Sequence, residues 1–327
     1  MNHRRKLIGA LGAMALQAPF AAMAQTTTAA PRVVLLIAGS MRTQSDRVDA
    51  FRKRLRELGY TEGKNLTLEV RELDGKVDQL PAIMREIVQS NPAVIVTHGA
   101  GNPAARAATS TIPVVIAIGA DPVMDGFAVS LARPGGNFTG NAMILSLAYE
   151  KNVEILHEMV PKASRVGLLT NPQRKSYEPG KKLFEAAAAS RRLKAVILHA
   201  TGPQEISSAF AEAVAQRVDI LVVAFLDTFS NDPKLVPELA ARHRIPAIYA
   251  ADAHIAHGGL VFYGYSGAWL FANAAVFVDR ILKGRKPAEL PFEQPTRFEM
   301  VVNMKTAKSL GLNIPQTVLI RADRVIE

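Results

Sequence analysis

The chain has 327 residues, no cysteine, 49% hydrophobic residues and a formal net charge of +10 at pH 7. Without cysteine it can form neither disulfides nor thiolate metal sites, and it cannot carry a lipid on an N-terminal cysteine. Basic and acidic residues are interleaved along segments such as 47–57 and 181–194. A nucleic-acid-binding protein would concentrate its positive charge on one face or motif, so we predict no nucleic-acid partner.

The first 24 residues have the features of a secretory signal peptide. Arg4-Arg5-Lys6 gives a basic start, and the apolar stretch Leu7–Phe20 that follows is too short to span a bilayer. Ala22-Met23-Ala24 has the small-x-small pattern of a cleavage site, so we predict a periplasmic protein that begins at Gln25 and has no stable membrane insertion. The twin arginine fits both Tat and Sec export, and the choice between them stays open.

Short runs rich in Val, Ile and Leu alternate with segments of helical periodicity. Val48, Phe51, Leu55 and Leu58 are spaced as on one face of a helix that ends at Gly59. Continuous apolar strands separated by helices indicate parallel sheets covered on both faces. The predicted strands are Val33–Ala38, Leu66–Val70, Val94–Thr97 and Val114–Ile118 in the first half, and Val166–Leu169, Ala195–Leu198, Ile220–Phe225 and Ala247–Tyr249 in the second.

The second half repeats the series of the first. Arg32-Val33 recurs as Arg165-Val166, and Ile112-Pro113 recurs at the same spacing as Ile245-Pro246. About 300 residues are too many for one core of this kind. We therefore predict an α/β protein with two similar doubly wound parallel-sheet lobes.

The C-terminal part does not begin a third lobe. Strands at Leu260–Tyr265 and Phe298–Val302 and a helix at Ala268–Leu282 are expected to complete the two sheets, with the chain crossing between lobes that move as hinged bodies. The predicted division is a signal peptide at 1–24, a first lobe at 32–142 plus 262–290, and a second lobe at 143–261 plus 291–327.

Ligands of open parallel sheets bind beyond the carboxyl ends of the strands. Asn or Asp stands before Pro at four places in such loops: Asn102, Asp121, Asn171 and Asp232. This pair suits an N-cap followed by the first helical position, so we predict helix starts, which hold carboxylates well. We expect Asp121 and Asn171 also to contact the ligand, with capping alone as the alternative, and Asp232 to cap only.

The candidate ligand-binding residues share a position at or near the end of a predicted strand. They are Ser40, Thr43, His98, Gly99, Asn102, Gly119, Asp121, Asn171, Asp227, Thr228, Asp252 and Tyr263. Some have a second interpretation: Thr43-x-x-Asp46 also fits a capping box, His98 is typical of an exposed loop histidine without a role, and Tyr263 fits a core position equally well.

Catalytic motifs are missing from the sequence. No G-x-S-x-G elbow, Walker A loop or G-x-G-x-x-G follows a predicted strand. His254 and His257 with Asp252 resemble part of a metal site but have no third placed ligand. We therefore predict no catalytic activity, no metal and no cofactor.

Three separate motifs lie at residues 131–140 (LARPGGNFTG), 281–288 (ILKGRKPA) and 303–311 (NMKTAKSLG). They resemble motifs of ABC transporter substrate-binding proteins of the tryptophan/tyrosine-uptake type, and the closing 321–327 extends the likeness over essentially the whole chain after the signal. The resemblance implies a type I periplasmic binding protein fold with three crossovers and no catalysis. It also implies a small-molecule ligand and an ABC transporter permease as partners, and we expect a monomer.

The resemblance supports uptake more firmly than it supports one ligand. Asn102 replaces a threonine that is frequent in the family, and residues 250–257 are richer in Asp and His than in related proteins. The expected ligand is an amino acid, aromatic in characterised members, or a related small carboxylate. An extracytoplasmic sensor for a membrane signalling partner is the alternative, since the same fold serves receptors and repressors. A hydrolase would need a nucleophile–base pair, which is not found.

Overall fold

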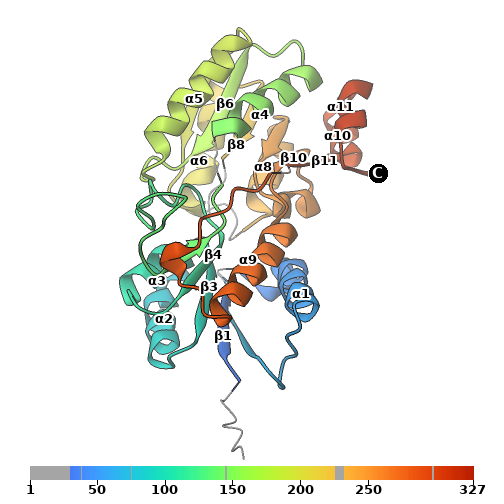
Figure 1. Cartoon of the computed structure of the whole chain (residues 1–327). Coiled ribbons are helices and arrows are strands. Elements are labelled where there is room, and N and C mark those ends of the chain that lie inside the picture. Colours follow the sequence, from blue (N-terminus) through green and yellow to red (C-terminus); the bar gives the residue numbers. More distant parts are fainter. Residues whose placement is uncertain (1–29, 38, 75, 144–145, 225–231, 297) are drawn as a thin grey trace, which may run out of the picture.

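The computed structural model describes residues 30–37, 39–74, 76–143, 146–224, 232–296 and 298–327. Two sheets, each packed between helices, form two lobes that lie one above the other in Figure 1. All eight strands predicted from the two halves are present, with each end within two residues of the prediction. The predicted α/β architecture of two similar parallel-sheet lobes is confirmed.

The first lobe contains a five-stranded parallel sheet in the order β2-β1-β3-β4-β5. Its strands are β1 (Arg32–Ile37), β2 (Thr67–Glu72), β3 (Val94–His98), β4 (Val114–Ile118) and β5 (Phe138–Gly140). Its helices are α1 (Met41–Glu57), η1 (Val77–Gln79), α2 (Leu80–Gln89), α3 (Gly101–Ala108) and, from much later in the chain, α9 (Gly267–Leu282) and η3 (Pro287–Glu289).

The second lobe contains a seven-stranded sheet in the order β12-β11-β10-β9-β8-β6-β7, in which only the β10–β11 pair is antiparallel. Its strands are β6 (Arg165–Thr170), β7 (Lys194–His199), β8 (Ile220–Val223), β9 (Ala247–Tyr249), β10 (Val261–Gly264), β11 (Glu299–Asn303) and β12 (Arg324–Ile326). Its helices are α4 (Ser146–Met159), α5 (Tyr177–Ser190), α6 (Pro203–Ala215), α8 (Leu235–Arg242), η2 (Asp252–His257), α10 (Met304–Leu310) and α11 (Gln316–Arg321). The order β7-β6-β8-β9-β10 repeats that of the first sheet.

The chain passes between the lobes three times, after β5, between β10 and α9, and before β11 (Figure 1). Two details differ from the prediction. β10 and β11 both belong to the second sheet, because Val261 pairs with Ile248 of β9 and with Val302 of β11. The predicted return to the first lobe at residue 262 therefore falls inside a strand of the second sheet, and the return begins with α9.

Alternate residues of β1 explain why both faces of the first sheet are covered. Val33, Leu35 and Ile37 are fully buried in the cluster that includes α1 and α9. Val34 and Leu36 are fully buried in the opposite cluster, with α2 and α3. A strand buried on both sides needs a continuous apolar run, which is what the sequence supplies. The open edge left for a ligand is the carboxyl end of the strands.

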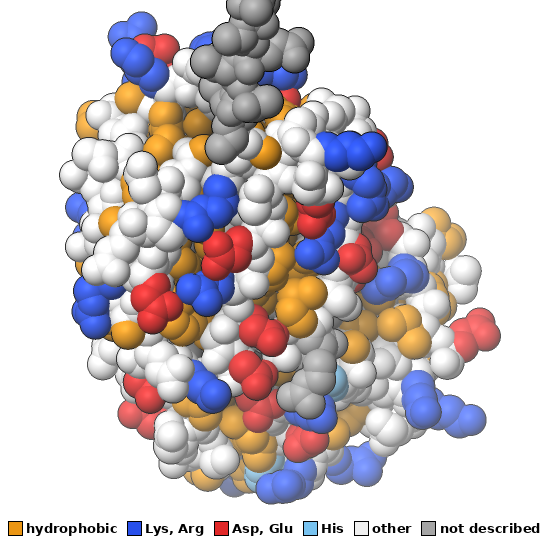
Figure 2. Space-filling view, turned by 90° about the horizontal axis from the view of Figure 1, so that it is seen from below, with side chains coloured by type: hydrophobic (Ala, Val, Ile, Leu, Met, Phe, Trp, Pro, Cys, Tyr) orange, Lys and Arg blue, Asp and Glu red, His pale blue; other side chains and the backbone are white. Residues whose placement is uncertain are grey.

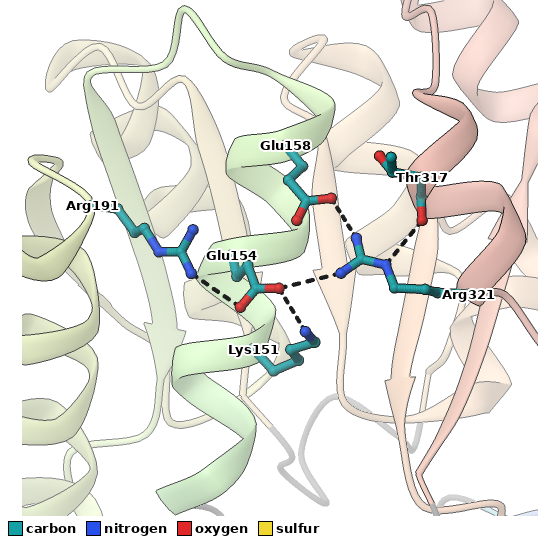
Figure 3. A network of polar contacts seen from close by, with 6 residues as sticks. All are labelled: Lys151, Glu154, Glu158, Arg191, Thr317 and Arg321. Atoms are coloured by element: carbon teal, nitrogen blue, oxygen red, sulfur yellow. Dashed lines mark hydrogen bonds and ion pairs between the residues drawn. The ribbon is translucent and has the colours of Figure 1, made fainter.

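A network of charged side chains holds the C-terminal helix against the second lobe (Figure 3). The Glu154 carboxylate in α4 accepts hydrogen bonds from Lys151 at 2.5 Å, Arg191 at 3.0 Å and Arg321 of α11 at 3.2 Å, and Arg321 also pairs with Glu158. The hydrogen bond from Lys151, together with the neighbouring guanidinium charges, holds the pKa of Glu154 below its usual value despite partial burial. One carboxylate thus joins α4, the end of α5 and α11.

Surface charges of both signs are mixed across the face seen in Figure 2, as their interleaving in the sequence predicts. Among the residues that the structure describes, no helix is both long enough and apolar enough to cross a membrane.

Candidate ligand-binding site

A cavity of about 370 Å³ lies between the two lobes at the carboxyl ends of the strands. We call it the inter-lobe cavity. The first lobe contributes Gly99, Asn102, Arg106, Gly119 and Phe127 to its wall, and the second lobe contributes Arg174 and Lys175. This is the position at which open parallel sheets bind ligands, and the volume lies in the range of small-molecule pockets.

Asn102 joins the ends of β3 and β4 at the floor of this cavity. Its Oδ1 accepts a hydrogen bond from the Thr97 hydroxyl at 2.7 Å, and its Nδ2 donates to the Ile118 carbonyl at 3.0 Å. The side chain is buried and α3 already begins at Gly101, so the prediction that Asn102 caps this helix is wrong. Through these two hydrogen bonds the amide of Asn102 links β3 to β4.

Gly99 and Gly119 allow the backbone to approach closely at the same place. Gly99 has a φ of 59°, in the region that glycine adopts most readily, and its N–H donates to the Ile118 carbonyl at 3.3 Å. A Cβ on Gly119 would lie 2.7 Å from the Cγ2 atom of Ile116. Backbone rather than side chains therefore forms this part of the wall.

Asp121 and Asn171 cap turns and do not begin helices. Asp121 Oδ1 accepts from the N–H groups of Val123 and Met124 at 2.9 and 3.1 Å, and Asn171 Oδ1 accepts from the Gln173 N–H at 2.8 Å. The predicted capping bonds exist, but the chain after Asp121 forms only turns, and α5 does not begin until Tyr177. Neither residue is among those that line the inter-lobe cavity.

Asp232 also stands in a turn. Its Oδ1 accepts from the Lys234 N–H at 3.1 Å, and α8 begins at Leu235. The side chain therefore bonds the backbone of the N-cap residue Lys234, two positions before it, and does not occupy the N-cap position itself.

His98 is buried, and the interpretation as an exposed loop histidine is wrong. It is the last residue of β3, it is 6% exposed, and its ring meets that of Phe271 of α9 edge to face at 5.4 Å. Burial, and then the positive charge of Arg47, lowers the pKa of His98 to about 3. The imidazole is therefore neutral at physiological pH.

This low pKa makes the stability of the protein depend on pH. In the unfolded chain a histidine titrates near 6.5, so between pH 6.5 and 3 the unfolded state binds a proton that the native state does not. The contribution of neutral His98 is present above pH 6.5 and is lost as the pH falls below it. We expect the free energy of unfolding to fall by about 2 kcal/mol from pH 7 to pH 5 because of His98 alone.

Urea unfolding of the wild type and of His98→Gln at both pH values tests this expectation. The variant should be less stable than the wild type at pH 7, and the gap between them should shrink at pH 5. A gap of the same size at both pH values would show that His98 does not cause the loss.

Asp252 forms a polar contact between the lobes. Its Oδ1 lies 2.5 Å from Nη2 of Arg47 in α1, and its Oδ2 accepts from the Gly267 N–H at 3.1 Å, at the start of α9. Burial favours the neutral acid, but Arg47 and the Gly267 N–H outweigh it and hold the pKa of Asp252 below its usual value. The pair borders a second cavity of about 690 Å³ between α1, η2 and β12.

The other predicted residues fall in several places. Tyr263 of β10 stacks on Phe298 at 5.0 Å, and Ser40 accepts the Gln44 N–H at its carbonyl at 3.1 Å, just before α1. Thr43 lies in the first turn of α1, directly before a kink at Gln44, and the helix as a whole begins at Met41. Asp227 and Thr228 lie outside the described residues.

His254, which resembles part of a metal site in the sequence, contacts the backbone instead. His254 is buried and its Nδ1 lies 3.0 Å from the Pro233 carbonyl. In the part of the chain that the structure describes, no group of three or more His, Asp or Glu side chains is arranged to hold a metal ion.

Sequence reasoning missed Arg106, Phe127, Arg174 and Lys175. Arg106 donates to the Asp125 carbonyl at 2.8 Å, and its guanidinium lies over the Phe127 ring, 5.7 Å from the centroid. The basic pair Arg174-Lys175 in the loop after β6 was a usable signal, but basic residues are spread along the whole chain and do not single out this pair.

Two α/β lobes, three crossovers and a cavity at the facing strand ends are the architecture of the type I periplasmic binding protein fold. The chain belongs to the family described as ABC transporter substrate binding protein, which it matches over residues 33–326. Members of this family are binding proteins and not enzymes, so the predictions of family and of a non-catalytic protein are confirmed.

Individual relatives agree with the family. A tyrosine-binding protein from Clostridioides difficile is 24% identical over 265 residues, which cover 80% of this chain and 75% of the relative. A conserved domain protein from Vibrio cholerae has a TM-score of 0.81 and 26% identity, and the match covers 90% of this chain and 99% of the other. An ABC domain from Streptococcus pneumoniae, solved in complex with L-Trp, also has a TM-score of 0.81, with 23% identity and the same coverage.

Proposed function

We propose that the protein captures an amino acid or a related small carboxylate in the inter-lobe cavity and delivers it to the membrane permease of an ABC importer. The observation that carries the proposal is that both lobes contribute to one cavity at the carboxyl ends of their strands. A ligand held there contacts both lobes at once, so it favours the conformation in which they are close together.

Several features support a carboxylate as the group that is recognised. Arg106, Arg174 and Lys175 line the cavity, and guanidinium groups match carboxylates in geometry and charge. The relative named as a tyrosine-binding protein is similar in sequence, and the domain solved in complex with L-Trp is similar in fold, which supports an amino acid as ligand. We assign ligand contact to the loops after β3, β4 and β6, which carry the cavity-lining residues Gly99, Gly119 and Lys175.

Delivery to a permease requires export from the cytoplasm. The signal-like segment 1–24 supports cleavage before Gln25 and a periplasmic location, and the family is typically extracytoplasmic. The exported protein would act as a monomer that docks on its permease.

Ligand binding should stabilise the protein and draw the lobes together. A ligand at 100 times its Kd raises the unfolding free energy by about 2.7 kcal/mol, which a thermal-shift screen of amino acids and small carboxylates detects. For any hit, small-angle scattering of the saturated protein should give a smaller radius of gyration than that of the ligand-free protein.

Two outcomes would count against the proposal. If no compound of either class stabilises the protein, small-carboxylate capture is wrong. A variant whose lobes are apart without ligand excludes a protein that is closed from the start. If a tight ligand does not reduce the radius of gyration of such a variant, closure around the ligand is wrong.

A further inference from the structure

The two lobes place positive charges on opposite walls of the inter-lobe cavity. Arg106 lies on α3 of the first lobe, and Lys175 lies in the turn after β6 of the second lobe. Arg174 is next to Lys175 in the same wall, and Asp125 is the acidic residue among those that line the cavity.

Arg106 is held in place by groups that carry no charge. Its Nη1 donates to the backbone carbonyl of Asp125 at 2.8 Å, and its guanidinium lies over the Phe127 ring. Even a Cβ on Gly126 would lie 2.6 Å from Nη1, so the loop 125–127 closely surrounds the guanidinium. Such contacts orient the group but leave its positive charge available to a ligand.

The contact between Arg47 and Asp252 differs from the inter-lobe cavity in how its charges are paired. There, a cation of the first lobe meets an anion of the second at 2.5 Å, and the two charges satisfy each other. At the inter-lobe cavity the two lobes together contribute three cationic side chains against the one carboxylate of Asp125, so the residues that line it carry net positive charge. Like charges repel more strongly as the lobes close and water leaves, unless an anion lies between them.

We infer that the solute carries net negative charge and belongs to the class of small organic dicarboxylates. This inference rests on the proposed function and narrows its ligand class. An aromatic amino acid is a zwitterion and brings one positive group for its one carboxylate, so it cannot offset cations on both walls. A dicarboxylate presents an anionic group to each lobe, and the volume of about 370 Å³ suits a small solute.

Calorimetry with named probes tests the inference on the secreted protein. Succinate and glutarate are the dicarboxylate probes, and tyrosine and tryptophan are the zwitterionic probes. We expect at least one dicarboxylate to bind ten times more tightly than either amino acid, and its affinity to fall as salt is raised, because salt screens charges that solvent reaches.

Lys175→Gln and a matched control locate the effect. Lys175→Gln should weaken dicarboxylate binding tenfold or more, because it removes a charged contact on one wall. Lys182→Gln makes the same change at an exposed position of α5 outside the cavity wall, and it should stay within twofold of the wild type.

The outcomes separate this inference from the proposed function. Tighter binding of tyrosine or tryptophan, or equal effects of the two lysine variants, overturns the dicarboxylate inference and leaves small-carboxylate capture standing. Binding of neither class of probe, or of any other amino acid or small carboxylate, overturns both.

Discussion

Replacing Gly140 by alanine should destabilise the first lobe by about 3–5 kcal/mol, the largest single effect we expect outside the cavity. Gly140 ends β5 with a φ of 135°, a conformation that residues with a side chain rarely adopt. A Cβ there would lie 2.3 Å from the carbonyl oxygen of Ile116 and 2.7 Å from its nitrogen. These are backbone atoms of the neighbouring strand, so β5 would have to move away from β4.

Two other glycines separate the contributions to this effect. Gly63 has a φ of 79° but open space around its Cβ position, so Gly63→Ala should cost only the backbone strain, about 1 kcal/mol. Gly136 has open space and no positive φ, so Gly136→Ala should be nearly neutral. Urea unfolding ranks the three, and a Gly140→Ala variant no less stable than Gly63→Ala would disprove the steric account.

Gly140 also shows how the sequence can point to a position without explaining it. The resemblance to a known family includes Gly140 within residues 131–140, but the reason for glycine is a backbone 24 positions earlier in the chain. β5 itself was not predicted, because Phe138–Gly140 is three residues long and contains no apolar run. Short strands of this kind form only when a neighbouring edge is already in place.

Most of the eight main strands were predictable because burial on both faces leaves a continuous apolar run, whereas the partly exposed edge strands β2 and β7 keep enough Val, Ile and Leu to be found. β12 was not, since Arg324 and Val325 are exposed and the strand is held mainly by pairing with β11. Pairing of this kind depends on which edge remains open after the rest of the sheet has formed. Local sequence does not contain that information.

The candidate site was predictable in place but less so in residues. The rule that ligands bind beyond the strand ends found Gly99 and Gly119, which line the inter-lobe cavity. The same reasoning gave Asp121 its bonds to backbone N–H groups but could not tell a turn from a helix, because that depends on how the next segment packs. The burial of His98 depends on Phe271, which comes from a helix far along the chain.

Replacing Asp252 by asparagine should cost about 3 kcal/mol and weaken ligand binding at least tenfold. The Arg47 side chain is only 8% exposed, so loss of its partner leaves a largely buried charge unpaired. In buried pairs this loss costs about 3–5 kcal/mol of unfolding free energy. We expect a cost at the lower end of that range because the Asp252 side chain is 25% exposed. Since the two residues belong to different lobes, the protein can hydrate Arg47 by moving the lobes apart. The ligand-free variant should therefore have a larger radius of gyration than the wild type.

Fluorescence offers a second measurement of the same opening. Trp269 is the single tryptophan of the chain, lies two residues after Gly267 and is 45% exposed. The Gly267 N–H donates to Asp252, so we expect separation of the lobes at this point to change the surroundings of the nearby indole. Asp252→Asn should therefore change the tryptophan emission of the ligand-free protein, and ligand should change it further.

A double-mutant cycle with Arg47→Met decides whether Asp252 affects binding through Arg47 or by contacting the ligand. The second alternative is the one predicted from the sequence, because Asp252 follows β9. If the ion pair sets the lobe equilibrium, either single change breaks it, and Asp252→Asn should add little to the loss of affinity already caused by Arg47→Met. If Asp252 also bonds the ligand, Asp252→Asn should weaken binding about tenfold again in the Arg47→Met background. The short contact with Arg47 and the bond from the Gly267 N–H occupy both carboxylate oxygens, so we expect the non-additive result. If calorimetry shows that the two losses of affinity add, Asp252 contacts the ligand.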